Sequence, residues 1–589
     1  MDKKVLLLLV LLFAFVLRMQ NFAEVFDSQI YYYEYDPYYH MRLVEVIVEK
    51  GSRPNYDYYL NYPYGMRVDW LPLFDYILAV PGVIFGFQSS EIFAVFLPVI
   101  LGVLSVFLIY LISLELVKNQ KFALFSAFIY TVIPISVWRS ILGFPDHHSW
   151  VVFLLLLSFY LLLKPGFWKI LSGIPMLLMA FSWLGTPIYA AILAISALLS
   201  FKERELRLIA ISNAIPLFSF IQQPYIAFSF LILALFLFLG SFVKSYETKI
   251  KNATIYYTLS SLFCVLLVYF LPIRTFDFLR AGINYIFGVD IYLPTISEAG
   301  QFQILDLIGS AGHIFFILAF ISIFLFKNRF LISIFILSLF LSLMQVRFTE
   351  ILAIPVAFLS AYTFCIILDR VEYPIFEKVE EKKRRKEKFK KKKEKKEKEI
   401  VSTKDHLVVA VFICILAIPC ISMAIVPFEL TRDWKEALTW MKENLENQDY
   451  LNPYEKPEYA ILSWWDYGNW ILYLSKKAVV CNNFQAGAED AAKFFVAESE
   501  EEAMKLIEKR GVKYLITVDE LTVRENKKTK FSAVMQIAGL NPSLMTNKEI
   551  EEYFNKTILY KLHVENAKNL THFRLLRDFG SVKIFEVLN

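Results

Sequence analysis

Cysteine is scarce in this sequence, which removes two common ways of stabilising a fold. Only five cysteines occur in 589 residues, and four of them (Cys264, Cys365, Cys414 and Cys420) lie in apolar runs. Their spacing matches neither a disulfide framework nor a structural zinc site. The fold must therefore rest on packing and hydrogen bonds.

Charge is also in short supply, and this excludes an ordinary soluble domain. Charged residues make up 20% of the chain and hydrophobic residues 57%, with a mean hydropathy of +0.49. Such values indicate a polytopic α-helical membrane protein. The net charge of +5 is unevenly spread, because the block "EEKKRRKEKFKKKKEKKEKE" ending at Glu399 carries much of the positive charge. We interpret this block as a solvated cytoplasmic loop or charged helix, without a role in binding nucleic acid.

The first apolar run, Val5–Leu17, lacks a small-residue cleavage site after it, since "RMQNFAEVF" follows. We therefore expect a retained membrane anchor rather than a cleaved signal peptide. Similar runs recur as far as Val426, and their lengths predict about thirteen transmembrane helices. They are expected near Val5–Leu17, Glu91–Val117, Phe122–Trp138, Ser149–Leu163, Ile170–Phe181, Thr186–Phe201, Leu206–Ile221, Pro224–Val243, Thr254–Leu271, Ile304–Phe326, Phe330–Met344, Glu350–Leu368 and His406–Val426. The stretch Leu71–Phe87 is expected either to extend the second span or to lie at the membrane interface.

Basic residues in the connecting loops predict the orientation of the chain. With Lys3 and Lys4 inside, thirteen spans place the loops "VKNQK", "KPGFWK", "FKERELR", "KSYETKIK" and "KNR" on the cytoplasmic side, as the positive-inside rule requires. The same arrangement places outside the loop that follows the first span, the loop around Asp146, the loop 273–303 and everything after Val426.

We therefore expect a membrane domain over residues 1–426 and an extracellular globular domain over 427–589. In the second part, "ESEEEAMKLIEKRG" predicts an amphipathic helix and "VKYLITVD" predicts a strand after it. This order is typical of a mixed α/β domain.

Histidine is rare as well, and its distribution points to a site. Of seven histidines, three lie in two of the expected external loops, "YYYEYDPYYHMR" and "GFPDHHSW". Asp146 and His148, two residues apart, can converge on one divalent ion, and Asp36 from the other loop can complete the site. Mixed oxygen and nitrogen ligands suit Mn²⁺ or Mg²⁺, with Zn²⁺ also possible. Asp36 precedes Pro37 and could equally begin a helix.

A metal site at the outer membrane face favours a substrate that the bilayer itself delivers. A lipid-linked pyrophosphate sugar fits, because a metal can stabilise the leaving phosphate while other carboxylates orient the nucleophile. Arg347, in "LMQVRFTE" at the expected outer end of a span, is a candidate ligand of the lipid phosphate. An ion pair with Glu350 is the alternative.

Four motifs in this order resemble the catalytic subunit of oligosaccharyltransferase, specifically its single-subunit archaeal AglB type. They are "EYDPYYH" at Glu34, "DHH" at Asp146, "TISE" at Thr295 and "WWDYG" at Trp464. The resemblance implies a GT-C glycosyltransferase of thirteen helices with a C-terminal globular domain. It also implies inverting transfer of a preassembled glycan from a dolichol (pyro)phosphate carrier to the asparagine of Asn-x-Ser/Thr, outside the cell.

The resemblance implies a role for each matching residue near the reaction. Asp36, Asp146 and His148 correspond to metal ligands. Glu298 corresponds to the glutamate of a motif that holds the acceptor peptide, and with Asp36 it would engage the acceptor amide near the metal.

The remaining matches concern the two substrates. Arg347 and His147 correspond to residues near the lipid phosphate. Trp464, Trp465 and Asp466 correspond to the site that binds the hydroxyl of the acceptor Ser or Thr.

An Asp-x-x-Lys-type element of the family matches loosely at Asp519 and Lys530, which places Val534 near a threonine methyl. Read without the family, "SWWDYGNW" favours a buried aromatic cluster. We expect Tyr467 and Trp470 to serve as the scaffold.

Three alternatives differ in class. Another GT-C enzyme, such as a protein O-mannosyltransferase or a lipid-linked arabinosyltransferase, would lack WWDYG. A transporter or flippase of lipid-linked glycans would carry acids inside its spans. A third interpretation makes the C-terminal part an adhesion or scaffold domain.

Overall fold

The computed structural model describes residues 2–246, 304–370, 415–523 and 530–588. The chain forms two compact units, each assembled from segments that are distant in sequence. The helical unit contains Met1–Phe22, Leu97–Leu142 and His147–Val426, and the mixed unit contains Ala23–Phe96, Gly143–Asp146 and Pro427–Asn589. The segment expected to form the first external loop thus folds in one unit with the C-terminal part of the chain.

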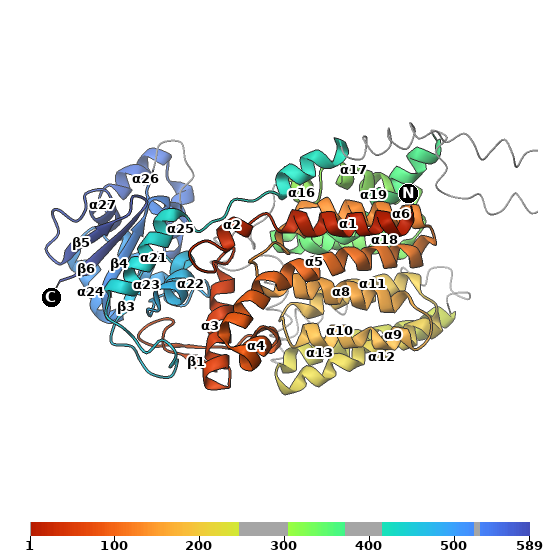
Figure 1. Ribbon diagram of the computed structural model, residues 1–589, viewed down its shortest axis with the longest axis horizontal. Coiled ribbons are helices and arrows are strands. Elements are labelled where there is room, and N and C mark those ends of the chain that lie inside the picture. Colours follow the sequence, from red (N-terminus) through yellow and green to blue (C-terminus); the bar gives the residue numbers. More distant parts are fainter. Residues whose placement is uncertain (1, 247–303, 371–414, 524–529, 589) are drawn as a thin grey trace, which may run out of the picture. The chain divides into compact units, whose positions relative to one another are not determined.

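The helical unit is a bundle of apolar helices (Figure 1). Every expected span that lies wholly within the described residues coincides with one helix or with two successive helices. Thr254–Leu271 lies outside the described residues, and of His406–Val426 only residues 415–426 are described, with a helix over Ile415–Ala424. The helices are α1 (Lys3–Arg18), α5 (Phe87–Val117), α6 (Gln120–Val132), α7 (Pro134–Trp138), α8 (His147–Leu163), α9 (Trp168–Leu171), α10 (Gly173–Ala180), α11 (Thr186–Ser200), α12 (Glu203–Ala214), η1 (Ile215–Ile221), α13 (Pro224–Tyr246), α16 (Ile304–Ser310), α17 (Ile314–Leu325), α18 (Arg329–Met344), η4 (Val346–Phe348) and α19 (Thr349–Arg370).

Among the residues that the structure describes, length and apolarity single out three helical segments that could cross a membrane, Phe87–Val117, Pro224–Phe242 and Val346–Leu368. A fourth arises if α16 and α17, which are bent by 95°, count together. Several other apolar helices are shorter, in part because a proline interrupts the run, as Pro134 does between α6 and α7. The protein is a membrane protein, and the number thirteen stays a prediction.

Small residues let α19 lie at the centre of the bundle. Ala353, Ala357 and Ala361 have no exposed surface, and α19 packs against α6, α17 and α18. Short side chains of this kind allow the close helix approach on which packing depends where lipid surrounds the bundle.

The mixed unit contains a four-stranded sheet in the order β3-β4-β6-β5. Its strands are β3 (Ala460–Leu462), β4 (Val512–Val518), β5 (Phe573–Asp578) and β6 (Val582–Val587). β3 runs parallel to β4, and the other pairs are antiparallel, with Leu515 opposite Phe585. Leu515 and Phe585 have no exposed surface, which places the hydrophobic core at the two central strands.

Helices of the C-terminal part surround this sheet in Figure 1. The predicted amphipathic helix and strand are confirmed as α24 (Glu500–Arg510) and β4. α24 begins at Ser499, whose side chain accepts a hydrogen bond from the Glu502 amide, and ends at Gly511 in a left-handed conformation. The other helices are α21 (Arg432–Asn444), α22 (Gly468–Trp470), α23 (Ala488–Val496), α25 (Phe531–Ile537), α26 (Asn547–Phe554) and α27 (Ile558–His563).

The first external loop contributes α2 (Phe22–Val25), α3 (Asp36–Lys50), the short pair β1 (Tyr56–Asp57) and β2 (Met66–Arg67), and α4 (Leu73–Phe85). Leu71–Phe87 therefore does not extend the second span as one straight helix. Gly86, at φ 92, separates α4 from α5, a backbone conformation that glycine adopts at little cost.

Candidate active site

Asp36 lies at the first turn of α3, in the mixed unit. Pro37 follows it, and this favours a helix start at that point. The unpaired amide groups and the dipole at a helix N-terminus stabilise a carboxylate there. Asp36 also accepts a hydrogen bond from the Asn469 side chain at 3.4 Å, so two distant segments determine its position.

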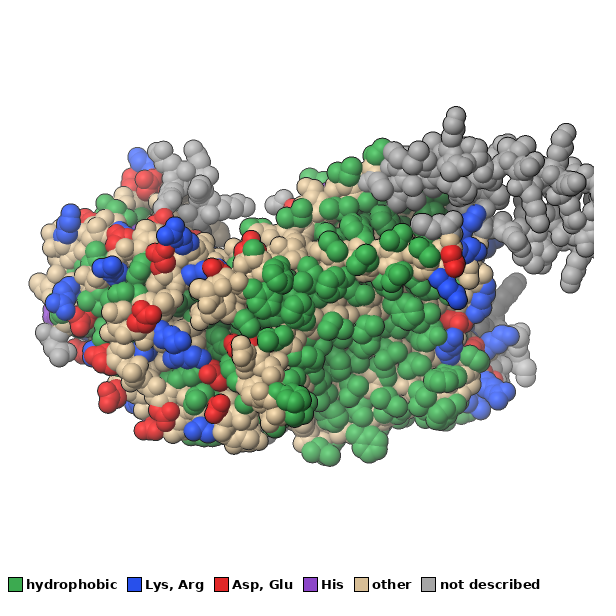
Figure 2. All heavy atoms as spheres, in the orientation of Figure 1, with side chains coloured by type: hydrophobic (Ala, Val, Ile, Leu, Met, Phe, Trp, Pro, Cys, Tyr) green, Lys and Arg blue, Asp and Glu red, His purple; other side chains and the backbone are tan. Residues whose placement is uncertain are grey.

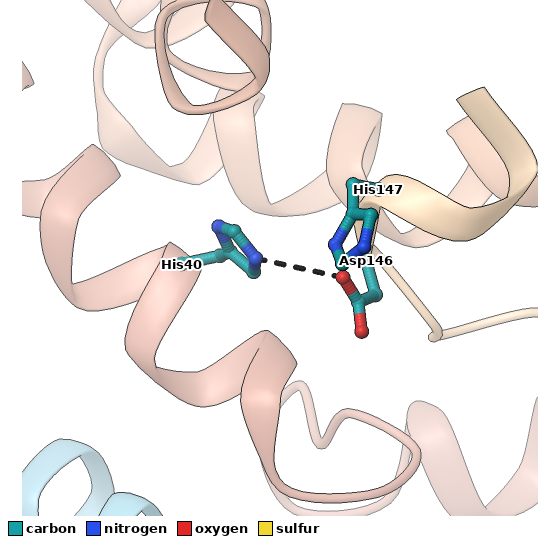
Figure 3. Close-up of side chains that lie close together, drawn as sticks. All are labelled: His40, Asp146 and His147. Atoms are coloured by element: carbon teal, nitrogen blue, oxygen red, sulfur yellow. Dashed lines mark ion pairs between the residues drawn. The ribbon is translucent and has the colours of Figure 1, made fainter. Parts of the chain in front are cut away.

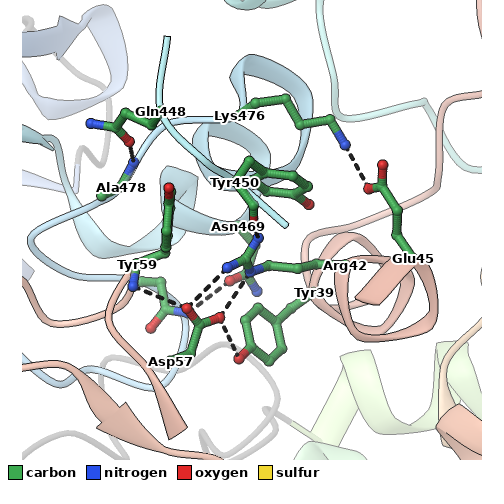
Figure 4. Close-up of polar contacts among 11 residues, drawn as sticks. Tyr39, Arg42, Glu45, Asp57, Tyr59, Gln448, Tyr450, Asn469, Lys476 and Ala478 are labelled. Atoms are coloured by element: carbon green, nitrogen blue, oxygen red, sulfur yellow. Dashed lines mark hydrogen bonds and ion pairs between the residues drawn. The ribbon is translucent and has the colours of Figure 1, made fainter. Parts of the chain in front are cut away.

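A buried polar network holds α3 against the C-terminal segment (Figure 4). Arg42 donates to both carboxylate oxygens of Asp57, at 2.8 and 3.0 Å, and to the Tyr450 carbonyl at 2.7 Å. The guanidinium also lies over the rings of Tyr59 and Tyr450, 4.8 and 4.2 Å from their centroids. Arg42 and Asp57 have no exposed surface, so the pair is shielded from water, and it anchors the helix that carries Asp36.

Asp146 approaches the same helix through His40. The backbone around Asp146 is docked by two hydrogen bonds, from the Gly143 amide to the Val95 carbonyl and from the Tyr33 amide to the Gly143 carbonyl. His40 Nε2 then lies 3.6 Å from Asp146 Oδ1, as Figure 3 shows. The third residue drawn there, His147, follows Asp146 in the chain and begins α8.

The other ring nitrogen of His40 contacts a second carboxylate. Nδ1 lies 2.5 Å from Asp75, which has no exposed surface and also binds Arg53 at 2.7 Å. Burial lowers the pKa of His40, but Asp75 and Asp146 outweigh it and raise the pKa to about 10. His40 thus bridges Asp146 and Asp75, which connects Asp146 to α4.

The WWDYG motif lies at the carboxyl end of β3, where the chain turns into η5 (Trp465–Tyr467). Gly468 is required because a Cβ there would lie 2.3 Å from the Cys481 carbonyl oxygen. Trp464 is 1% exposed and Trp470 2%, so much of the motif belongs to the core. Trp465 Nε1 is buried and has no hydrogen-bond partner among the described residues. An indole N–H without a partner is costly unless a ligand supplies the acceptor.

Asp466 beside it is held by a lysine. Lys530 Nζ lies 2.6 Å from Asp466 Oδ2 and 2.9 Å from Glu520 Oε2. Burial raises the pKa of Asp466, and the charge of Lys530 opposes this rise. The lysine thus favours the ionised carboxylate that a hydroxyl donor would need.

Further contacts connect the segment that follows the WWDYG motif to the segment around Asp36. The Trp470 indole donates to the Glu34 carbonyl at 3.0 Å, and the Tyr35 ring stacks on Trp470 with centroids 4.5 Å apart. Together with the Asn469–Asp36 bond, these contacts place the predicted catalytic aspartate and the WWDYG segment side by side within the mixed unit.

His148 belongs to the helical unit, at the start of α8. Its Nδ1 lies 2.9 Å from Glu350 Oε2. Glu350 also accepts a hydrogen bond from the Tyr189 hydroxyl and lies 3.9 Å from Arg139. A histidine whose Nδ1 is held by a carboxylate presents Nε2 in a defined direction, as metal-binding histidines commonly do.

The remaining predicted residues occupy different settings. His147 stacks on His148, with Trp183 beyond it at 5.9 Å. Arg347 is half-buried in η4. Val534, on α25, has no exposed surface. Glu298 lies outside the described residues.

Comparison with known proteins identifies the family. The family model described as "Oligosaccharyl transferase STT3, N-terminal" matches residues 5–433, and the one described as "AglB core domain" matches residues 431–522. The chain belongs to the STT3/AglB oligosaccharyltransferase family. It is 62% identical over 589 residues to dolichyl-phosphooligosaccharide-protein glycotransferase 1 of Archaeoglobus fulgidus, with 100% of each chain covered.

Glycotransferase 2 of that organism is 60% identical over 592 residues, covering 100% of this chain and 99% of the relative. The A. fulgidus AglB structure with an inhibitory peptide and a dolichol-phosphate has the same fold. Its TM-score is 0.80 at 21% identity, over 98% of this chain and 79% of that one. The predicted resemblance is thereby confirmed.

As an oligosaccharyltransferase, the protein is a glycosyltransferase. This finding removes the transporter and the scaffold from the alternatives. It also removes the O-mannosyl- and arabinosyltransferases.

Several residues of this oligosaccharyltransferase site were not predicted from the sequence. Asn469, His40 and Glu350 contact predicted site residues across 433, 106 and 202 positions of chain, respectively, and the sequence alone predicted none of these contacts. Lys530 was matched only loosely, yet it contacts Asp466 directly. Its partner Glu520 follows Asp519, which itself pairs with His563 at 2.8 Å.

Proposed function

We propose that this oligosaccharyltransferase transfers a preassembled glycan from a dolichol (pyro)phosphate carrier to the side-chain amide of Asn-x-Ser/Thr, with inversion at the anomeric carbon. The buried, unpartnered Trp465 Nε1 beside Asp466 carries the acceptor half of this proposal. An orphan donor next to an ionised acceptor matches a hydroxyl group, which both donates and accepts. In this proposal Trp464 and Val534, which are 1% and 0% exposed, complete the hydroxyl site.

A site built around a hydroxyl rejects acceptors that lack one, because its polar groups would stay unpaired. This explains a requirement for Ser or Thr two residues after the asparagine. An A. fulgidus relative has been solved with a tethered acceptor peptide containing the NVT sequon, which agrees with this assignment.

We further propose that Asp36, Asp146 and His148, together with Glu298, hold a divalent cation, Mn²⁺ or Mg²⁺. The donors fit such an ion: carboxylate oxygens and one imidazole whose Nδ1 is already engaged by Glu350. An A. fulgidus relative has been solved in complex with Zn and sulfate. A bound cation would supply Lewis-acid stabilisation of the leaving phosphate.

The chain's own residues must activate a poor nucleophile. The acceptor amide nitrogen shares its lone pair with the carbonyl. Asp36 and Glu298 would accept hydrogen bonds from its two N–H groups and twist the C–N bond, which localises the lone pair for attack. Arg347 and His147 would bind the lipid phosphate.

The proposed arrangement in the cell follows from the basic loops. The membrane domain comprises residues 1–426 in a GT-C arrangement, and residues 427–589 form the extracellular globular domain. The enzyme acts as a single subunit on dolichol-linked oligosaccharide and on acceptor polypeptides that contain Asn-x-Ser/Thr.

Glycan transfer to a fluorescent Asn-x-Thr peptide by the purified enzyme tests the proposal, with Asn-x-Ala as the matched acceptor. We expect transfer to the first peptide alone, loss of activity in excess chelator and recovery with Mn²⁺ or Mg²⁺. Glu298→Gln should abolish transfer. Full activity in excess chelator contradicts the metal assignment, and full activity of Glu298→Gln contradicts the amide assignment.

A further inference from the structure

A cavity of about 690 Å³ opens at the basic end of the helical unit. Its lining comes from three connections: the α11–α12 turn, the end of α13 and the α17–α18 turn. Figure 2 shows Lys and Arg side chains gathered at this end, beyond a largely hydrophobic surface. The volume lies within the range of ligand sites in proteins.

The lining carries an excess of positive charge. Lys202, Lys244, Lys327 and Arg329 contribute four cations, and Glu203 is the single acid among the lining residues. Glu203 already pairs with Arg207 on its own helix. The backbone amide of Lys202 donates to the Glu205 carboxylate at 3.3 Å. Within the part of the chain that the structure describes, the side-chain cations of Lys202, Lys327 and Arg329 have no carboxylate partner, so the cavity attracts an anion.

Part of the cavity lining is aromatic. Phe201 and Phe330 both line it, with ring centroids 5.3 Å apart at an interplanar angle of 67°. Phe330 is 3% exposed. A lining that combines cations with aromatic rings suits an amphiphile better than it suits a free, fully hydrated anion.

The apolar surface continues from the cavity along α13. Leu235, Leu239 and Phe242, at spacings of four and three residues, are 50%, 62% and 42% exposed, and they form one stripe on this helix. The stripe ends two residues before Lys244, which lines the cavity. Acyl chains lying along this stripe would place a headgroup at the cavity.

We propose that this cavity binds the phosphate-bearing headgroup of an anionic membrane phospholipid, with Lys327, Arg329 and Lys202 contacting the phosphate. Basic sites between membrane helices bind such headgroups on the cytoplasmic side, and the positive-inside rule assigns this end to that side. The site is separate from the glycan-transfer residues and serves to bind lipid.

Native mass spectrometry of the delipidated full-length enzyme tests the site, with phosphatidylglycerol as the probe and phosphatidylcholine as the neutral control. Lys327→Gln with Arg329→Gln removes two lining cations. At roughly 1 kcal/mol for each charge at a membrane surface, binding of phosphatidylglycerol should weaken about 30-fold. Lys118→Gln with Arg204→Gln removes two basic-loop charges that do not line the cavity and should leave binding nearly unchanged.

Equal weakening in the two double variants would overturn the proposal, because it would mean that only the general charge matters. Equal binding of phosphatidylcholine, or equally tight binding of inorganic phosphate, would also overturn it. Unchanged melting temperatures and unchanged glycan transfer to the Asn-x-Thr peptide confirm that each variant is folded. Lys202→Gln alone should then give an intermediate loss.

Discussion

Replacing Asp57 by asparagine tests how strongly the first external loop is held within the mixed unit. Asp57 accepts two hydrogen bonds from Arg42, one from the Tyr39 hydroxyl at 3.1 Å and one from the Tyr59 amide at 3.0 Å. Asparagine has nearly the same shape, so it removes the negative charge and one acceptor without creating a cavity (Figure 4). Arg42 then keeps its charge with no counter-charge in the network.

The expected magnitude follows from burial, because neither residue of the pair is exposed. Removing one partner of a buried ion pair typically costs about 3–5 kcal/mol, since the remaining charge stays away from water. The unfolding equilibrium constant of Asp57→Asn should therefore rise by roughly two to nearly four powers of ten. The two tyrosine rings around Arg42 offset part of this cost.

Urea unfolding in detergent, followed by tryptophan fluorescence, measures the effect, because Trp464, Trp465 and Trp470 lie in the same unit. Asp69→Asn is a matched control, since Asp69 pairs with Arg67 at 3.1 Å and their side chains are 68% and 75% exposed. An exposed pair is worth about 0–1 kcal/mol. Equal shifts of the urea midpoint in the two variants would refute the reasoning.

Three further predictions concern the active site. Trp465→Phe removes the indole N–H that has no partner among the described residues. A lost bond to a buried partner costs about 1–3 kcal/mol. In competition assays, the preference for Asn-x-Thr over Asn-x-Ala peptides should therefore fall by one to two powers of ten. Lys530→Met removes the charge that opposes the raised pKa of Asp466, so this pKa should rise further. Peptide binding, which weakens as Asp466 is protonated at falling pH, should then be lost at a higher pH than in the unmodified enzyme. Identical pH profiles of KM in the two enzymes contradict this prediction. Glu350→Gln should weaken Mn²⁺ binding about 10- to 100-fold by loosening His148, measured by electron paramagnetic resonance, and unchanged affinity contradicts the role of Glu350.

The elements that the sequence predicts best are those with a local cause. Apolar runs predict the helices because each residue in a bilayer-facing helix must be apolar, whatever its distant neighbours are. Breaks inside a run were not predicted, as at His313, whose φ of 44° separates α16 from α17. Such a break depends on tertiary packing, and a hydropathy pattern does not record it.

In the active site, too, features with a local cause were predicted and features that depend on tertiary packing were not. Motif spacing indicated Asp146 and His148, because a carboxylate and an imidazole two residues apart can converge on one divalent ion. The residues that orient these groups lie elsewhere, and Glu350 is 202 positions from His148. In the sequence, a glutamate at the start of an apolar run looks like a helix cap. Its contact with His148 is visible only in the three-dimensional structure.

The composition of the mixed unit also has a consequence for the order of folding. Arg42 binds the carbonyl of Tyr450, which is 408 residues later in the chain. During synthesis, α3 and Asp36 therefore cannot form their contacts with Tyr450 and Asn469 until almost the whole membrane part has been synthesised. Contacts of such long sequence separation form slowly. A truncated or stalled chain should thus remain inactive, because the segment that contains Asp36 forms its contacts with the C-terminal part only when translation is nearly complete.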